Sequence, residues 1–301
     1  MLSELVKTTT RDALRLDGAL FTPSTATSLE LDACLLLHGV GGNFYGGNLF
    51  EFLTPKLLEL GIAILRVNTR GHDAFSWATT QAGPSRQGSA YEIVDHCRND
   101  VAAWVDFLVA RGFQRVGLFG HSLGAVKAIY SQAYDPHAAV KCILAASPPR
   151  LSYSAFQNGP DSSVFFEAIT TAQQHVQAGR AETLFQTKFP VPLLVAAAAY
   201  LDKYGSDERY NVLRFVDRLT CPLLVTYGQR ELESGNIAFA GMHEAIRSAG
   251  PASQTVPRSQ TVSPSQTVDV FTIANADHFY SGVYDALGEQ LVDWLQKRFD
   301  T

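Results

Sequence analysis

Short apolar runs alternate with segments of helical periodicity along most of this chain, and this alternation limits the possible folds more than any other sequence feature. Six runs are mostly apolar and about six residues long, which is typical of strands buried on both faces. They are Asp32–Leu37, Ile62–Asn68, Arg115–Gly120, Val140–Ala145, Pro222–Tyr227 and Val268–Ile273. Strands that alternate with helices predict an α/β protein whose mostly parallel sheet is covered on both faces.

The segments around these strands carry apolar residues at the three- and four-residue spacing of amphipathic helices. Helices are expected over Leu49–Leu60, Glu92–Arg111, Leu123–Ala133, Ile237–Ala249 and Val283–Phe299. Two N-terminal segments, Leu5–Thr9 and Leu14–Phe21, fit an antiparallel edge of the sheet. The chain is 46% apolar and can bury a large core, as one large domain or as two small ones.

An insertion over Leu151–Leu219 separates two predicted strands by far more than a usual connection. It is helical in pattern and rich in aromatic residues, and its alanine-rich stretch Val191–Leu201 predicts a packed helix rather than a membrane span. Such insertions commonly form lids or binding elements. A helical crossover that only packs against the sheet is the alternative.

A second insertion, Pro251–Val268, contains Ser-Gln-Thr-Val three times, beginning at Ser253, Ser259 and Ser265. Three copies of a polar hexapeptide are too few to build a repeat core. We expect a low-complexity surface loop and assign it no function.

Charge and cysteine content limit the partners and the compartment. With 24 Lys and Arg against 29 Asp and Glu, the net charge of −5 offers no basic surface for nucleic acid or an anionic membrane. The four cysteines are widely spaced, and the N-terminus lacks the apolar core of a secretory signal. A reduced, cytoplasmic protein with a small-molecule substrate is therefore expected, and no feature indicates an oligomeric state.

The pentapeptide Gly120-His121-Ser122-Leu123-Gly124 lies between a predicted strand and a predicted helix. In that position a Gly-x-Ser-x-Gly motif indicates a nucleophile elbow, a sharp turn that exposes the serine hydroxyl. Side chains at Gly120 and Gly124 would collide with the neighbouring strand and helix. We therefore predict that Ser122 is a catalytic nucleophile.

A serine hydroxyl needs a histidine base and a carboxylate that orients the histidine, in the chain order Ser, acid, His. His278 follows the last predicted strand and is the predicted base. For the acid, the turn after Pro222–Tyr227 offers Glu231, with Glu233 as the alternative. Some related folds carry the acid one strand earlier, but here that turn, residues 147–150, has no carboxylate.

Two backbone N–H groups are predicted to form the oxyanion hole. Leu123 supplies one at the start of its helix. The second is expected from Val40, or alternatively Gly41, in the glycine-rich run after Asp32–Leu37. This run does not fit a dinucleotide or phosphate loop, and no cluster has metal-ligand spacing, so neither a cofactor nor a metal is expected.

Four motifs in this order resemble those of the α/β-hydrolase superfamily over nearly the whole chain. They are His38–Gly42, Asn68–His72, Gly120–Gly124 and Ala276–Phe279. In that family the second motif often reads Asp-x-Arg-Gly-His, and Asn68 replaces its acid here. The segment is usually scaffold or a wall of the site, so the replacement leaves the triad prediction unchanged.

The resemblance implies a single domain over residues 1–301 with an eight-stranded sheet and a helical cap at the insertion over residues 151–219. It also implies hydrolysis of an ester or related acyl bond without a cofactor. A serine at the elbow argues against dehalogenases and epoxide hydrolases, which place an aspartate there. Thioesterases, amidases, C–C hydrolases, acyltransferases and lyases share the fold, as do receptors that keep the triad. The sequence therefore predicts a serine hydrolase, with these activities and a ligand-binding protein as alternatives.

Overall fold

An eight-stranded sheet forms the centre of the computed structural model, which describes residues 2–80, 83–250 and 267–300. Its strands, in spatial order, are β1 (Glu4–Thr9), β2 (Arg15–Phe21), β4 (Ala63–Val67), β3 (Ala33–Leu37), β7 (Val116–His121), β8 (Val140–Ala146), β11 (Leu223–Gly228) and β12 (Val268–Ile273). The strands from β4 to β12 are parallel, whereas β1 and β2 form the predicted antiparallel edge. The predicted α/β class and the mostly parallel sheet are confirmed.

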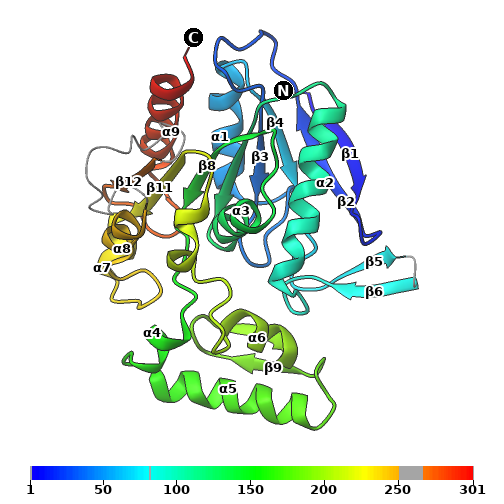
Figure 1. Cartoon of the computed structure of the whole chain (residues 1–301), viewed down its shortest axis with the longest axis vertical. Helices are drawn as coiled ribbons and strands as arrows, with labels where there is room; N and C mark the ends of the chain where they lie inside the picture. Colours follow the sequence, from blue (N-terminus) through cyan, green and yellow to red (C-terminus); the bar gives the residue numbers. More distant parts are fainter. Residues whose placement is uncertain (1, 81–82, 251–266, 301) are drawn as a thin grey trace.

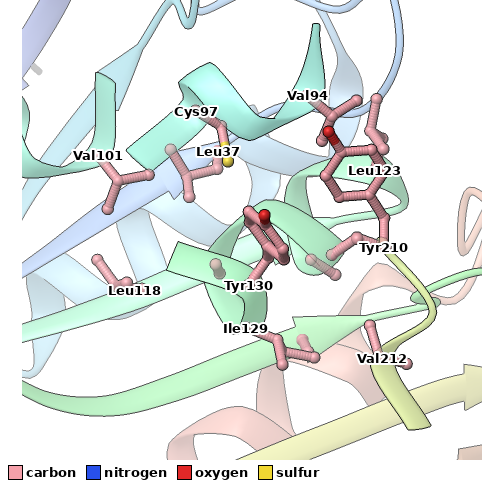
Figure 2. Packing of buried hydrophobic residues seen from close by; sticks show 14 of the residues in the cluster. Leu37, Val94, Cys97, Val101, Leu118, Leu123, Ile129, Tyr130, Tyr210 and Val212 are labelled. Carbon is pink, nitrogen blue, oxygen red and sulfur yellow. The ribbon is translucent and has the colours of Figure 1, made fainter. Parts of the chain in front are cut away.

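Helices cover both faces of this sheet (Figure 1). One cluster of buried residues joins α1 (Asn48–Glu59) and α9 (Tyr284–Phe299) to the sheet, and another joins α2 (Cys97–Ala110), α3 (Leu123–Tyr134) and α8 (Met242–Ala249) to the opposite face. Successive strand residues point to opposite faces, so Leu36 belongs to the first cluster while Leu35 and Leu37 belong to the second. Figure 2 shows the second cluster, in which strand and helix side chains interdigitate.

The insertion between β8 and β11, which we call the cap (residues 151–219), packs beyond the end of the sheet (Figure 1). It contains α4 (Tyr153–Gln157), α5 (Ser162–Gln177), β9 (Leu184–Thr187), β10 (Leu193–Ala196), α6 (Ala197–Tyr204), η2 (Val212–Arg214) and η3 (Val216–Arg218). The helix predicted over Val191–Leu201 is wrong in its first half, because β10 pairs there with β9. Pro190 and Pro192 explain the difference, since proline lacks an N–H and disfavours helical geometry in the preceding residue.

The remaining elements include one hairpin that the sequence did not predict. The hairpin of β5 (Ser76–Thr80) and β6 (Gly83–Gln87) was not predicted, and the short helix η1 (Val94–His96) precedes α2. Apart from Thr267 and Val268, the predicted low-complexity loop lies outside the described residues. No helix within the described ranges is long and apolar enough to cross a membrane.

Candidate active site

Ser122 occupies a strained turn between β7 and α3. Its backbone angles are φ 55° and ψ −122°, a region that residues other than glycine rarely adopt. A Cβ atom at Gly124 would lie 2.2 Å from the carbonyl oxygen of Leu37, and one at Gly120 would lie 2.2 Å from that of Gly124. The two flanking glycines therefore let β3, β7 and α3 approach closely enough to form the turn.

His278 lies in the loop after β12 and faces the serine. Its Nε2 is 3.0 Å from Ser122 Oγ, although 156 residues separate the two in the chain. The neighbouring His121 side chain places its Nε2 2.7 Å from the backbone carbonyl oxygen of His278. Because a carbonyl oxygen only accepts, His121 donates this bond and anchors the loop that carries His278.

Glu231 lies in α7 (Gln229–Glu233), directly after β11, and its carboxylate bonds to Nδ1 of His278. Its side chain is only 1% exposed. Glu233 is exposed instead, and its carboxylate accepts a hydrogen bond from Gln229 Nε2 at 3.0 Å. The structure thus brings Ser122, His278 and Glu231 together and leaves Glu233 outside the site.

Two buried side chains support the carboxylate of Glu231, and sequence reasoning missed both. Ser147, at the end of β8, donates its hydroxyl to Oε2 of Glu231 at 2.6 Å. Tyr280 places its hydroxyl 3.0 Å from Ser147 Oγ and donates to the carbonyl oxygen of Thr226 at 3.0 Å. The one available signal was position, because Ser147 occupies the strand end at which some related folds carry the acid itself.

The two N–H groups predicted for the oxyanion hole belong to residues near Ser122, one in the chain and one in the fold. Leu123 is the first residue of α3, where a helix leaves its N–H without an intrahelical partner. Val40 follows Gly39, at which a Cβ atom would lie only 3.1 Å from Cβ of Ser122. The Val40 N–H makes no hydrogen bond with any described residue, so it is available to a bound oxyanion.

His38 holds the start of this glycine-rich loop. Its Nδ1 lies 2.8 Å from the Gly39 carbonyl oxygen, and its Nε2 accepts from the Thr69 N–H at 3.1 Å. Burial, reinforced by the charge of Lys127, lowers the pKa of His38 to about 3, which keeps the ring neutral and Nε2 an acceptor. The loop thus begins from a fully bonded, uncharged histidine.

We expect the neutral, buried His38 and His121 to make folding pH-dependent. Burial lowers the pKa of His121 to about 4, whereas histidine in the unfolded chain titrates near 6.5. A folded pKa below the unfolded one gives stability that is complete above pH 6.5 and is lost as the pH falls. Each histidine contributes a slope of up to about 1.4 kcal/mol per pH unit in this range.

Urea unfolding of wild type and His121→Asn between pH 7.5 and 5 measures one of these contributions. The free energy of unfolding of the variant should fall less steeply with decreasing pH. The same change at the exposed His96, His96→Asn, should leave the slope as in wild type. Equal slopes for wild type and His121→Asn would contradict the assignment.

A cavity of about 830 Å³ opens onto Ser122 and His278. The loop after β3 lines one part of it, and Leu151, residues 190–193 and Tyr204 of the cap line another. A cavity of this size accommodates a small organic molecule. The described residues contain no group of three or more His, Cys, Asp or Glu side chains that could hold a metal ion.

Comparison with known protein families finds one family model that spans most of the chain. Residues 34–293 match the model described as the alpha/beta hydrolase family. No curated protein matches this sequence.

Solved structures with the same fold include several esterases. Est1E from Butyrivibrio proteoclasticus, solved with ferulic acid bound, is 16% identical with a TM-score of 0.63, covering 97% of this chain and 98% of its own. The Pyrococcus furiosus esterase PF2001 is 16% identical with a TM-score of 0.65, covering 100% and 92%. The alpha/beta hydrolase GrgF from Penicillium sp. sh18 is 14% identical with a TM-score of 0.68, covering 100% of both chains. These similarities confirm the predicted α/β-hydrolase fold.

Proposed function

This chain belongs to the alpha/beta hydrolase family, and we propose that it hydrolyses a carboxylic ester through an acyl-enzyme on Ser122. One observation carries the proposal. A continuous chain of hydrogen bonds runs from Ser122 Oγ through both ring nitrogens of His278 to a buried Glu231, and it begins at the wall of a large cavity. A nucleophile, a base and an orienting acid in this geometry are what acyl transfer requires.

The first half of the reaction forms the acyl-enzyme. Because Glu231 is a carboxylate, the Nδ1–H of His278 donates to it, and Nε2 is left free to take the Ser122 proton. Ser122 Oγ attacks the ester carbonyl carbon while the N–H groups of Leu123 and Val40 stabilise the oxyanion. His278 then gives the proton to the leaving alcohol, and the C–O bond of the ester breaks.

The second half restores the enzyme. His278 removes a proton from water, the resulting hydroxide attacks the acyl carbon, and the proton returns to Ser122 as the acid leaves. Glu231 stays ionised throughout and stabilises the imidazolium that forms twice per cycle. The bonds from Ser147 and the Gly228 N–H to Oε2 of Glu231 keep this carboxylate in place.

A substrate panel tests the proposed bond type. It contains the 4-nitrophenyl ester, the 4-nitrophenyl thioester and the 4-nitroanilide of one acyl group, together with a lactone of the same chain length. We expect measurable turnover of the ester, with the highest kcat/KM in the panel. Faster cleavage of the thioester would shift the assignment to thioesterase chemistry. Tight binding without turnover of any substrate would indicate a ligand-binding protein that has kept the triad.

Replacing Glu231 by glutamine should lower kcat for the ester by about 10²- to 10⁴-fold. Ser147 and the Gly228 N–H both donate to Oε2, so the single amide oxygen of glutamine is expected there. The amide NH₂ would then face Nδ1 of His278 and favour the tautomer that carries its proton on Nε2. That tautomer cannot accept the Ser122 proton.

Glu233→Gln, two residues further along α7, is the matched control and should retain wild-type kcat. Steady-state kinetics of both variants at one pH decide the assignment. A large loss in the Glu233 variant with none in the Glu231 variant would exchange their roles.

A further inference from the structure

One ionisable side chain, that of a lysine, stands out in the wall of the cavity. Lys203, in the last turn of α6 in the cap, is the only Lys, Arg, Asp or Glu among the described residues that line it. The residue is 3% exposed, and its Nζ is buried and makes no hydrogen bond with any described residue. A buried ammonium group without a partner is unfavourable, so such groups are usually paired when the protein is in its working state.

The carboxylates near Lys203 already have cations of their own. Glu92 forms an ion pair with Lys127 through Oε1 at 2.5 Å, both side chains are fully buried, and neither carboxylate oxygen makes a hydrogen bond with a described residue. Asp202 pairs with Arg209 at 3.0 Å and also accepts from Tyr210. Lys203 therefore adds a positive charge that no direct ion pair balances.

The surroundings of Lys203 counter its charge only in part. Burial lowers the pKa of its ammonium group, while the charges of Glu92 and Asp202 work in the opposite direction. The C-terminal end of α6 also favours a cation. Neither effect gives Nζ a hydrogen-bond acceptor, which a ligand in the cavity could supply.

We propose that Lys203 binds an anionic group of the substrate, so that the preferred substrate is an ester that also carries a carboxylate. A carboxylate placed at this wall would accept a charge-assisted hydrogen bond from Nζ and neutralise the extra charge. The other described residues that line the cavity carry apolar, amide, hydroxyl and imidazole groups. Among these described lining residues, Lys203 is the one lysine or arginine with which a carboxylate can pair. This proposal rests on the proposed ester hydrolysis and adds the substrate class.

Pairs of esters that differ in one carboxylate test the role of Lys203 with the full chain. On the acyl side the pair is 4-nitrophenyl hemiglutarate and 4-nitrophenyl valerate, and on the alcohol side it is 4-acetoxybenzoate and phenyl acetate. Within each pair the readout is kcat/KM for the ester with the carboxylate divided by kcat/KM for the ester without it. This ratio cancels any general loss of folding or catalysis. Lys203→Met should lower this ratio about 10- to 100-fold in at least one pair, mainly through a higher KM for the anionic ester.

Lys188→Met is the matched control, because Lys188 is an exposed lysine of the same cap outside the cavity wall. It should keep both ratios. Ratios that change less than twofold in Lys203→Met would overturn the proposal and leave Lys203 as a link between the cap and Glu92.

Binding to a catalytically silenced protein separates this proposal from the proposed function. In calorimetric titrations, Ser122→Ala should bind 4-nitrophenyl hemiglutarate or 4-acetoxybenzoate at least tenfold more tightly than Ser122→Ala/Lys203→Met does. If wild type cleaves no ester but this difference is present, ester hydrolysis is wrong and the anion site stands. If esters are cleaved and neither ligand shows the difference, the anion site is wrong.

Discussion

Replacing Ser122 by alanine is expected to lower kcat for 4-nitrophenyl esters by about 10⁴-fold or more. Without Oγ there is no nucleophile for His278 to activate, and direct attack by water loses the covalent step. The cavity and the oxyanion N–H groups remain, so KM should change little. The variant should also lose labelling by a fluorophosphonate, which reacts with an activated serine.

Ser163→Ala is the control, because it makes the same change at an exposed serine in α5 of the cap. It should keep both activity and labelling. Ester hydrolysis at the wild-type rate by Ser122→Ala would show that another group carries the reaction.

Replacing His278 by alanine should lower kcat by a similar factor, about 10⁴-fold or more. Its two ring nitrogens connect Ser122 to Glu231, so removing the ring disconnects the nucleophile from its acid. Because the residues act as a unit, Ser122→Ala/His278→Ala should be no slower than either single variant. Stopped-flow or long-time-course hydrolysis assays measure all three.

His96→Ala removes an exposed histidine next to α2 and should keep wild-type kcat. Losses that multiply in the double variant would mean that Ser122 and His278 act independently, contrary to the proposed mechanism.

The sequence was sufficient to predict the features that depend on local pattern. Each of the six apolar runs became a strand, and five of them are almost fully buried, which makes such runs recognisable by themselves. The sixth, β12, lies at the edge of the sheet and is partly exposed, contrary to the expectation of burial on both faces. The elbow was recognisable because the steric need for Gly120 and Gly124 is encoded within five residues. The order of acid and base then restricted the choice of partners to strand ends that meet at one edge of the sheet.

Features that depend on contacts between distant segments could not be predicted in this way. Glu231 and Glu233 differ by two positions in one turn, and only the packing around Ser147 and Tyr280 shows which of them is buried. The hairpin of β9 and β10 also escaped prediction, because its second strand continues directly into the alanine-rich start of α6. The sequence does not single out Lys203, which lies at the cavity wall only because the cap folds over the site.

The central claim is that Ser122 carries the acyl group during turnover, and trapping that intermediate tests it most directly. Wild-type protein is mixed with a 4-nitrophenyl ester, quenched in acid within milliseconds to seconds, and analysed by intact-protein and peptide mass spectrometry. We predict a mass increase of one acyl group on the peptide that contains Ser122, absent from Ser122→Ala. Turnover with no acylated peptide, or with the acyl group on another residue, would contradict the claim.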